Sequence, residues 1–378
     1  MEEIRVIISG GGTGGHIFPA ISIASAIKAK RPDAELLFVG ASGKMEMEKV
    51  PQAGYKIIGI PARGLKRPLY SPSNIGVLID YFKCKRRAKQ IIKEFKPNLA
   101  VGVGGYASAA IVSAAESRGI PVVLQEQNSF AGLVNRKNAA KATKICVAYD
   151  GMERFFPKEK IVFTGNPIRK EIKGSTPQLK EEGYKFYNLL PDKKTVFVVG
   201  GSLGCRTLNE WMKKELLNGD LFGSKESEYQ VIWQCGKYYK AEIESFMKGR
   251  ESSNIVWSDF IKRMDLAYAV ADVVISRAGA GTISELCEAG KCTIFVPSPM
   301  VAEDHQTHNA MALVNKNAAL LVKDSEAVEK LGSTVGALLS DDNKRVAFEN
   351  NIRGLAREDA AAQIADICLD IVDKKEQK

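Results

Sequence analysis

The chain has 378 residues, of which 45% are apolar and 26% are charged, and its formal net charge is +10. This length exceeds the roughly 250–300 residues at which single cores stop growing, so two domains are expected. The composition excludes collagen-like, low-complexity and disordered chains. Because the sequence has no apolar run of about 20 residues and no signal-peptide pattern, we expect an intracellular protein without a membrane-spanning segment. The seven scattered cysteines are typical of reduced thiols, and no disulfides are expected.

The positive charge predicts an anionic partner, either nucleic acid, acidic lipid or a phosphorylated substrate. Charge alone does not choose among the three. Nucleic-acid binders usually carry a recognisable reading motif or exposed aromatics between basic residues. The sequence contains no such motif, so no nucleic-acid partner is expected.

Short β-branched runs alternate with helical stretches along the whole chain. Strands are expected at 4–9, 35–39, 56–60, 99–103, 122–125 and 145–148, and again at 195–199, 230–234, 254–257, 273–276 and 293–296. This alternation is typical of parallel sheets covered by helices on both faces. The predicted fold class is therefore α/β, with two Rossmann-like domains separated by an irregular, lysine-rich stretch near 174–194.

The predicted domains are 1–165 and 166–354. The chain is expected to cross between them at 164–167, where glycine and proline interrupt the pattern. A last helical segment, 355–378, could dock on either domain, with return to the first as one possibility. The sequence of this helix does not decide between them.

Each predicted half has a glycine-rich turn after its first strand, at 10–15 and at 200–204. Such turns let backbone N–H groups approach a phosphate, and the following helix adds a favourable field. Packing alone also explains many glycine turns. The dinucleotide fingerprint is a poor match because 37–40 ends without an acidic residue, and the sequence has no GKS or GKT for a P-loop.

His16 directly follows the first glycine turn, at the start of a helix that Pro19 is expected to help initiate. A histidine in that place can act as a general base, because its ordinary pKa is near 6.5. The alternative is a neutral histidine that only hydrogen-bonds the helix start. His305 and His308 are too few to hold a metal, and no metal site is predicted; we interpret them as helix-start residues with Asp304 as the cap.

The segment 276–285 also follows a strand and enters a helix, with Glu285 about one turn inside it. A glutamate so placed can accept the hydroxyls of a ribose, while the small residues before it admit a diphosphate. The alternative is a glutamate favoured only by the helix dipole. A second polar cluster, 125–128, ends a strand where ligand groups usually lie, and four polar residues there are hard to explain by packing.

Taken together, 9–20, 102–106, 126–128, 165–169, 200–202 and 277–285 resemble the MurG family, the N-acetylglucosaminyltransferases of bacterial peptidoglycan synthesis. The similarity follows the order of nearly the whole chain, whereas 277–285 alone would indicate only the wider GT-B superfamily. The resemblance implies a GT-B architecture with two sheets facing a central cleft. It also implies inverting transfer of N-acetylglucosamine (GlcNAc) from UDP-GlcNAc to the muramyl 4-hydroxyl of undecaprenyl-pyrophosphoryl-MurNAc-pentapeptide, a step of cell-wall synthesis that supports cell shape and division.

The resemblance also implies that domain 1–165 holds the acceptor and contacts the membrane, that domain 166–354 holds the donor, and which residues form the site. The donor contacts would be Thr13, Gly14, Gly15, Asn128, Arg169, Ser202, Ile261, Arg277, Ala280, Gly281, Thr282, Glu285 and Gln306. The acceptor pyrophosphate would lie on Gly14, Gly15, Gly104, Gly105 and Tyr106. His16 is the candidate base, with Glu126 as a supporting or competing one. No cofactor is expected, because Arg169, the second glycine turn and a helix N-terminus can stabilise the leaving diphosphate.

Two alternatives remain open from the sequence. A related GT-B glycolipid glycosyltransferase or a UDP-GlcNAc epimerase would keep the nucleotide half and change the acceptor half. A non-enzymatic binding protein would keep the fold and leave His16 and both glycine turns without a role.

The stretch 75–96 begins apolar and continues basic, which suits an interfacial helix on anionic lipid. The predicted membrane-contact residues are Ile75, Leu78, Ile79, Phe82, Lys85, Arg86 and Lys89. The alternative is a packed helix with a solvated cationic face. A polyprenyl-linked acceptor favours the first interpretation, with the protein peripheral on the cytoplasmic face of the inner membrane.

Overall fold

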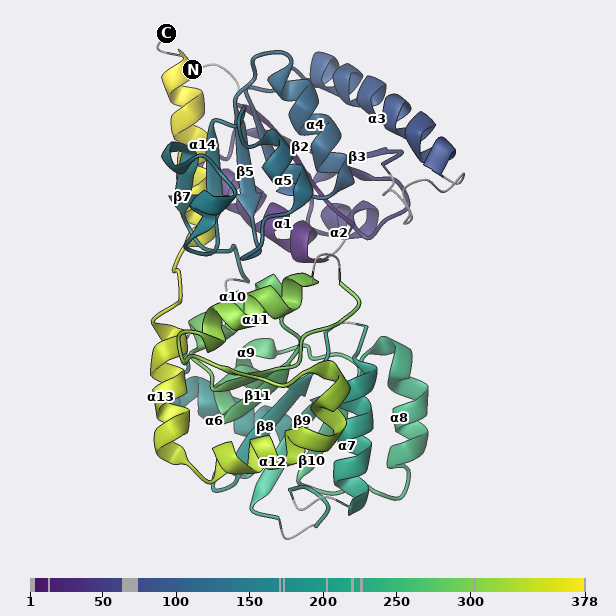
Figure 1. The fold of residues 1–378 in the computed structure, drawn as a ribbon, viewed down its shortest axis with the longest axis vertical. Helices are drawn as coiled ribbons and strands as arrows, with labels where there is room; N and C mark the ends of the chain where they lie inside the picture. Colours follow the sequence, from purple (N-terminus) through teal and green to yellow (C-terminus); the bar gives the residue numbers. More distant parts are fainter. Residues whose placement is uncertain are drawn as a thin grey trace. The chain divides into compact units, whose positions relative to one another are not determined.

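The computed structural model describes residues 4–12, 14–62, 74–169, 171–172, 174–201, 203–218, 221–224, 227–301 and 304–376. The chain divides into two compact units (Figure 1). Unit 1 is Met1–Ile168 with Arg357–Lys378, and unit 2 is Arg169–Ala356. The boundaries predicted from the sequence are 165/166 and 354/355. The chain therefore returns to its first unit at its end.

Unit 1 is built on a sheet of seven parallel strands in the order β3-β2-β1-β4-β5-β6-β7. Its strands are β1 (Arg5–Gly10), β2 (Glu35–Ala41), β3 (Lys56–Ile60), β4 (Leu99–Gly104), β5 (Val122–Glu126), β6 (Lys144–Val147) and β7 (Ile161–Phe163). Because β1 pairs with both β2 and β4, the chain order reverses between β1 and β4. The loops after these two strands lie at the switch point where α/β sheets bind ligands. The three-residue strand β7 was not predicted.

Helices cover both faces of this sheet. They are α1 (Gly14–Lys30), α2 (Glu46–Gln52), α3 (Asn74–Phe95), α4 (Tyr106–Glu116), α5 (Leu133–Asn138) and α14 (Ala360–Glu376). Ile7, Ile91 and Ile111 share the core under α3 and α4, and Ile8, Ile23 and Ile364 share the core under α1 and α14. Strands buried on both faces consist of continuous apolar runs, so the positions of these strands can be predicted from the sequence.

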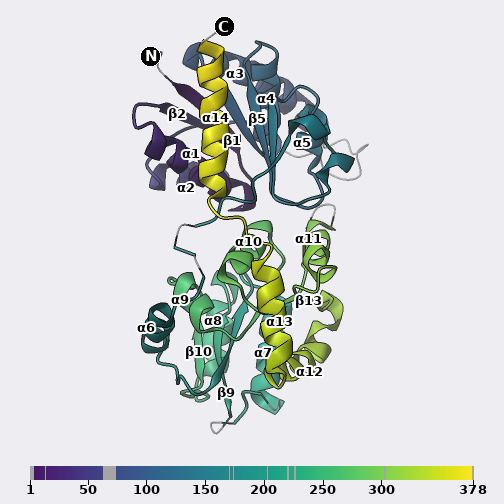
Figure 2. The same ribbon diagram turned by 90° about the vertical axis from the view of Figure 1, so that its left-hand side faces the viewer.

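Helix α14 belongs to unit 1, where it lies alongside α1 (Figure 2). Ile364, Ala365 and Cys368 are fully buried in the α1 core, and Lys30 contacts Asp366 at 2.6 Å. The apolar stripe of α14 therefore completes one face of the first sheet.

Unit 2 has six parallel strands in the order β10-β9-β8-β11-β12-β13. Its strands are β8 (Lys194–Val199), β9 (Tyr229–Gln234), β10 (Ile255–Ser258), β11 (Val273–Ser276), β12 (Thr293–Phe295) and β13 (Leu320–Leu321). Its helices are α6 (Pro177–Tyr187), α7 (Arg206–Asn218), α8 (Lys240–Met247), α9 (Met264–Val270), α10 (Ala280–Ala289), α11 (His305–Val314), α12 (Ala327–Leu339) and α13 (Asp342–Arg353). The chain order reverses between β8 and β11, so the loops after these strands meet at the second switch point.

Helix α6 corrects the prediction that 174–194 is irregular. Thr176 caps the helix by accepting the N–H of Leu179 at 3.2 Å, and Pro177 occupies the first turn. Gly183 faces α9, where a Cβ would lie 2.6 Å from Val270 Cγ1. The many charged residues of this segment led to the prediction of an irregular stretch, although the segment contains an N-cap, a first-turn proline and a closely packed glycine.

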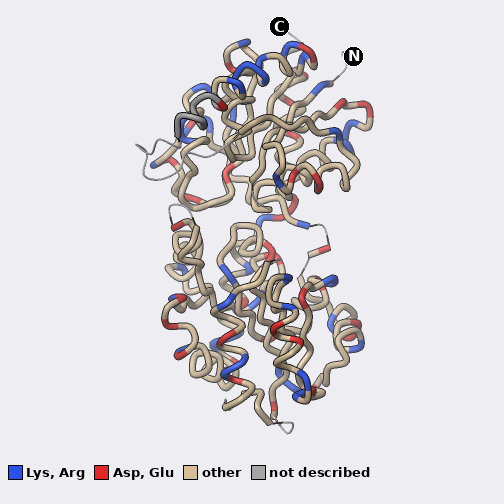
Figure 3. Tube along the Cα trace, turned by 90° about the vertical axis from the view of Figure 1, so that its right-hand side faces the viewer, with Lys and Arg blue, Asp and Glu red and all other residues tan. Residues whose placement is uncertain are grey.

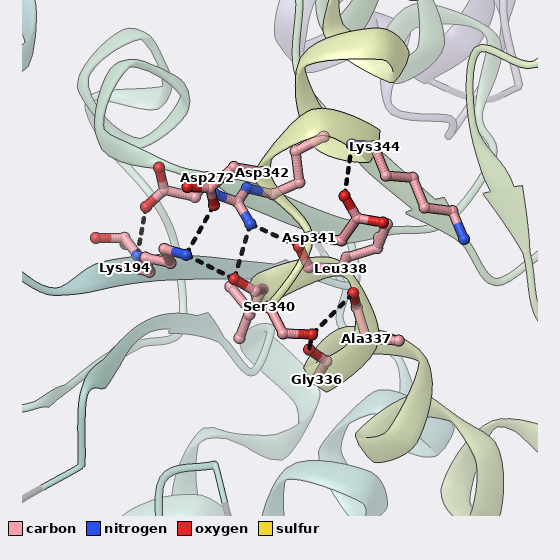
Figure 4. A network of polar contacts seen from close by, with 12 residues as sticks. Lys194, Asp272, Gly336, Ala337, Leu338, Ser340, Asp341, Asp342 and Lys344 are labelled. Carbon is pink, nitrogen blue, oxygen red and sulfur yellow. Dashed lines mark hydrogen bonds and ion pairs between the residues drawn. The ribbon is translucent and has the colours of Figure 1, made fainter.

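A polar network fastens the amino end of β8 to the α12–α13 corner (Figure 4). Lys194 donates to the carbonyl of Leu339 at 2.7 Å and to Asp342 at 2.8 Å. Asp341 caps α13 by accepting the N–H of Lys344 at 2.9 Å. These contacts lie at the edge of the sheet opposite to the switch-point loops, so they stabilise unit 2 without approaching the candidate site.

Lys291 is a buried lysine whose ammonium donates to the carbonyls of Ala269 and Ala271 at the end of α9. Burial lowers its pKa from 10.5 to about 8. Because the folded pKa is depressed, the unfolded chain binds more protons between pH 8 and 10.5. The stability contributed by Lys291 therefore rises with pH across that window, by about 3 kcal/mol in total.

Replacing Lys291 with methionine is expected to remove this pH dependence. Calorimetry at several pH values measures the stability of unit 2. In the unaltered chain this stability should gain a contribution above pH 8 that the K291M variant lacks. The exposed Lys344→Met variant is the control and should keep it. Parallel curves for K291M and the unaltered chain would contradict the assignment.

Candidate active site

The first glycine turn joins β1 to α1 in unit 1. Gly12 has a φ of +89°, a backbone conformation that favours glycine. Helix α1 begins at Gly14, so Pro19 lies inside the helix and does not initiate it, which corrects the prediction. His16 is half-buried in the first turn. Thr13 lies outside the described residues.

The turn between β4 and α4 lies against this first turn. Gly104 and Gly105 have φ values of +100° and +88°. A Cβ on Gly104 would lie 2.6 Å from Cδ2 of His16, and one on Gly105 would lie 2.5 Å from the carbonyl oxygen of Gly11. Only glycines allow this approach, so the fold brings together His16 and the predicted acceptor glycines. Tyr106 follows them with 59% of its surface exposed.

The polar cluster at the end of β5 is mostly interior. Gln125, Glu126 and Gln127 are all at least 98% buried. Gln127 donates to the carbonyl of Val103 at 2.7 Å, and Gln125 donates to Asn166 at 2.9 Å. The expectation that packing does not explain this cluster is wrong, because these side chains tie the ends of β4 and β5 to the 164–167 segment.

Glu126 accepts four hydrogen bonds within its own loop. The donors are the N–H and side-chain amide of Asn128, at 3.1 and 3.3 Å, the N–H of Gly132 at 3.0 Å and the amide of Asn135 at 2.9 Å. Burial raises the pKa of Glu126, and these donors oppose that rise. Four donors occupy the lone pairs of a carboxylate, so Glu126 is placed to shape the loop that carries half-buried Asn128.

The second glycine turn joins β8 to α7 in unit 2. Gly201 and Gly204 have φ values of +86° and +90°. A Cβ on Gly204 would lie 2.3 Å from the carbonyl oxygen of Cys235, so the turn packs tightly on the end of β9. Ser202, predicted to contact the donor, lies outside the described residues. Ile261, another predicted contact, is buried after β10, beside exposed Phe260.

Glu285 lies in α10 and forms a two-point ion pair with Arg169. Arg169 Nε contacts Glu285 Oε1 and Nη2 contacts Oε2, both at 2.8 Å. The buried hydroxyl of Tyr268 donates to Oε2 at 3.3 Å, and burial raises the pKa of this tyrosine well above 10, which keeps it a donor. The residues predicted for the diphosphate and for the ribose are therefore neighbours, and Tyr268 is a third member of the cluster that was not predicted from the sequence.

The start of α10 presents small residues. Gly279 is the N-cap residue, and Ala280, Gly281 and Thr282 form the first turn. A Cβ on Gly281 would meet no atom within 4 Å, so open space lies beside it. This turn has the small side chains that backbone approach to a phosphate requires.

Arg277 and Gln306 hold the loops around β12. The guanidinium of Arg277 donates to the carbonyls of Val296 and Pro297 at 2.9 and 3.0 Å and forms an ion pair with Asp324. Gln306 Oε1 accepts the N–H of Ala278 at 3.2 Å and of Ser298 at 2.8 Å. Both side chains thus have partners within the protein.

Asp304 precedes α11 but does not cap its backbone, which corrects the sequence prediction. Its φ is +50°, and its carboxylate accepts the hydroxyl of Thr307 at 2.7 Å. His305 and His308 lie on the helix that follows.

The predicted membrane-contact residues lie on α3 of unit 1. Side chains of Ile75, Leu78 and Ile79 lie outside the described residues. Phe82 is 64% exposed, Arg86 and Lys89 are exposed, and Lys85 is half-buried. Figure 3 shows the Lys and Arg positions of this part of the chain in blue. The opposite face of α3 is buried, through Cys84, Ala88, Ile91 and Ile92. One exposed stripe therefore runs along the helix, through Phe82, Arg86, Lys89 and Lys93. Among the described helices, none combines the length and apolarity needed to cross a bilayer.

Two α/β units built on parallel sheets, each with a glycine turn at its switch point, are features of a protein that binds nucleotides or other phosphorylated ligands. The chain belongs to glycosyltransferase family 28: the N-terminal domain model of that family matches residues 6–147 and the C-terminal domain model matches residues 195–364. The α/β fold class, with two parallel-sheet domains, and the glycosyltransferase activity are confirmed.

Relatives make the resemblance specific. The chain is 51% identical over 99% of its length to the whole UDP-N-acetylglucosamine--N-acetylmuramyl-(pentapeptide) pyrophosphoryl-undecaprenol N-acetylglucosamine transferase of Parabacteroides distasonis. It is 52% identical over 96% of both chains to the transferase of the same name from Bacteroides thetaiotaomicron. The crystal structure of Acinetobacter baumannii MurG superposes with a TM-score of 0.76 at 25% identity, covering 97% of this chain and 99% of that one. The predicted resemblance to the MurG family is confirmed.

Proposed function

We propose that this protein transfers GlcNAc from UDP-GlcNAc to the 4-hydroxyl of the muramyl sugar in undecaprenyl-pyrophosphoryl-MurNAc-pentapeptide, with inversion at the anomeric carbon. The observation that carries the proposal is identity above 50%, along nearly the full chain, with transferases named for this donor and acceptor. The reaction would complete the lipid-linked disaccharide precursor of peptidoglycan.

The UDP part of the donor is assigned to unit 2, whereas the predicted donor contacts Thr13, Gly14, Gly15 and Asn128 belong to unit 1. The UDP diphosphate would lie at the first turn of α10, beside Gly281, and on the turn at 200–204. The Glu285 carboxylate already accepts two N–H groups of Arg169 and the hydroxyl of Tyr268, so it would accept one ribose hydroxyl. Arg169, held beside it at 2.8 Å, would stabilise the charge that develops on the leaving UDP. Gln306 would use its amide nitrogen, because its oxygen already accepts two backbone N–H groups. Arg277 would act by holding the end of β12.

The acceptor is assigned to unit 1. Its pyrophosphate would bind the N–H groups of Gly14 and Gly15 at the start of α1, together with Gly104, Gly105 and Tyr106. In a single displacement the acceptor oxygen bonds to C1 of GlcNAc, and the C1–oxygen bond to UDP breaks with its electron pair leaving on the diphosphate. His16 would take the hydroxyl proton. The four donors on Glu126 support His16 over Glu126 for this role.

The decisive experiment incubates the purified chain with radiolabelled UDP-GlcNAc and a muramyl-pyrophosphoryl-lipid acceptor. Label should move to the lipid fraction with release of UDP, and nuclear magnetic resonance of the product should report a β linkage. Diacylglycerol is the control acceptor and should stay unlabelled. Labelled diacylglycerol, or epimerised sugar nucleotide formed without an acceptor, would instead support the related GT-B activities.

The protein is further proposed to work as a peripheral enzyme on the cytoplasmic face of the inner membrane, with anionic lipid and no nucleic acid as its surface partner. The exposed stripe on α3, where Phe82 lies beside Arg86 and Lys89, supports this placement. Each basic residue near an anionic surface contributes on the order of 1 kcal/mol, and salt screens that contribution.

Changing Lys85, Arg86, Arg87 and Lys89 to glutamate should release the protein from anionic vesicles and slow turnover of the full-length lipid acceptor. Activity on a short-chain, water-soluble acceptor should be largely kept, because the reacting groups are unchanged. Vesicle sedimentation at low salt measures the first effect. Equal sedimentation of the unaltered and charge-reversed proteins would exclude this face of α3 as the membrane contact.

A further inference from the structure

Glu46 is a charged side chain with no solvent exposure, located underneath the first glycine turn. It is the first residue of α2, which follows β2. Its Oε2 accepts the N–H of Gly12 at 3.0 Å, and its Oε1 accepts the same N–H at 3.2 Å and that of Ala41 at 2.9 Å. A buried carboxylate is costly unless it is fully hydrogen-bonded. Glu46 therefore requires the N–H of Gly12 as a donor, and the glycine turn is itself held by Glu46.

Two glycines make room for this carboxylate. A Cβ on Gly11 would lie 2.1 Å from Glu46 Oε1, and a Cβ on Gly40 would lie 2.4 Å from Glu46 Cγ. The φ of Gly11 is not in the left-handed region, so its backbone does not by itself require glycine. The reason for glycine at position 11 is therefore the space that Glu46 occupies.

The same turn contacts the second half of the acceptor site. The carbonyl of Gly11 lies where a Cβ on Gly105 would come within 2.5 Å, and the ring of His16 lies similarly close to Gly104. Displacing Gly11 and Gly12 would therefore also move the β4–α4 turn. Glu46 holds this turn through hydrogen bonds from the N–H of Gly12 to its carboxylate.

We propose that Glu46 is a positioning residue for the acceptor: it sets the conformation of 10–12 and thereby the placement of His16 and the pyrophosphate-binding N–H groups. This inference rests on the proposed function, because it takes the glycine turn as the acceptor site. Glu46 does not touch the substrate in this proposal. It acts on the acceptor in unit 1 and leaves the donor residues of unit 2 unchanged.

The test compares E46Q with E48Q, since Glu48 is exposed on the same helix. Glutamine keeps the size of Glu46 but turns one acceptor oxygen into a donor that opposes a backbone N–H. For E46Q, kcat/KM for the acceptor should fall about 10- to 100-fold, the value for one charge-assisted hydrogen bond. The affinity for UDP, which is assigned to unit 2, should stay within about twofold of the unaltered enzyme. E48Q should match the unaltered enzyme in both.

A second measurement uses the space at Gly11. G11A alone should lower acceptor kcat/KM, because its methyl collides with the carboxylate. In an E46A background the same methyl enters vacated space, so G11A should cost several-fold less there than in the unaltered chain. Equal effects of G11A in both backgrounds would contradict a role through Glu46.

Hydrogen exchange separates this inference from the proposed function. The amide of Gly12 should exchange faster in E46Q than in the unaltered chain, while amides of β4 and β5 keep their rates. Unchanged exchange at Gly12 in E46Q would overturn the positioning role and leave Glu46 as a general stabiliser of unit 1. Equal losses of UDP affinity and of acceptor kcat/KM would overturn it as well. Failure of the unaltered enzyme to label the lipid would instead refute the proposed function.

Discussion

Replacing His16 with alanine is expected to lower kcat by about 10²- to 10⁴-fold, the usual contribution of a general base. The acceptor hydroxyl must lose its proton as it attacks, and His16 is the half-buried titratable group beside the Gly104–Gly105 turn. UDP affinity should be unchanged, because the residues assigned to UDP lie in unit 2. Single-turnover kinetics with saturating donor would measure the chemical step.

The matched comparison is E126Q, which keeps the size of the other candidate base. Glu126 accepts four donors, so its amide variant should lose stability through unpaired donors and still turn over faster than H16A. If H16A retains near-normal turnover while E126Q retains its fold and loses activity, Glu126 is the base and our order is wrong.

Replacing Glu285 with alanine is expected to raise the donor KM by about 10- to 100-fold, with a smaller effect on kcat. A ribose contact is made equally in the ground and transition states, so its loss weakens binding more than chemistry. Charge-assisted hydrogen bonds contribute about 1.5–3 kcal/mol each. The variant also leaves Arg169 without the partner that holds it at 2.8 Å, which should add a modest loss in kcat.

Tyr268→Phe is the graded control for this prediction. It removes only the hydroxyl that donates to Glu285 at 3.3 Å and leaves the ion pair with Arg169. This hydrogen bond is long, and the carboxylate keeps both contacts with Arg169, so UDP affinity should fall less than about tenfold. Isothermal titration with UDP measures both variants. Unchanged UDP affinity in E285A would remove Glu285 from the ribose site.

The sequence by itself determined the two-sheet architecture and the location of the glycine turns. Strands of parallel sheets are buried on both faces, so runs such as 99–103 and 273–276 are apolar without interruption and can be recognised locally. Glycine turns that follow such strands lie at the carboxyl edge of the sheet by topology alone. His16 and Glu285 were found for the same reason, because each follows a strand and a small-residue turn within a few positions.

Tertiary structure decided which polar side chains are available to a ligand. Glu46 and Gly12 are 34 positions apart, and Arg169 and Glu285 are 116 apart, so neither pairing has a local signal. Gln125 and Gln127 were predicted as ligand groups, yet the fold buries them against Val103 and Asn166. Helix α14 has an apolar stripe that could pack on either unit. Its place is set by the apolar surface beside α1 in unit 1, which the stripe covers. The burial of a side chain and its hydrogen-bond partners depend on residues that are distant in the sequence. A local sequence pattern contains only the neighbours along the chain.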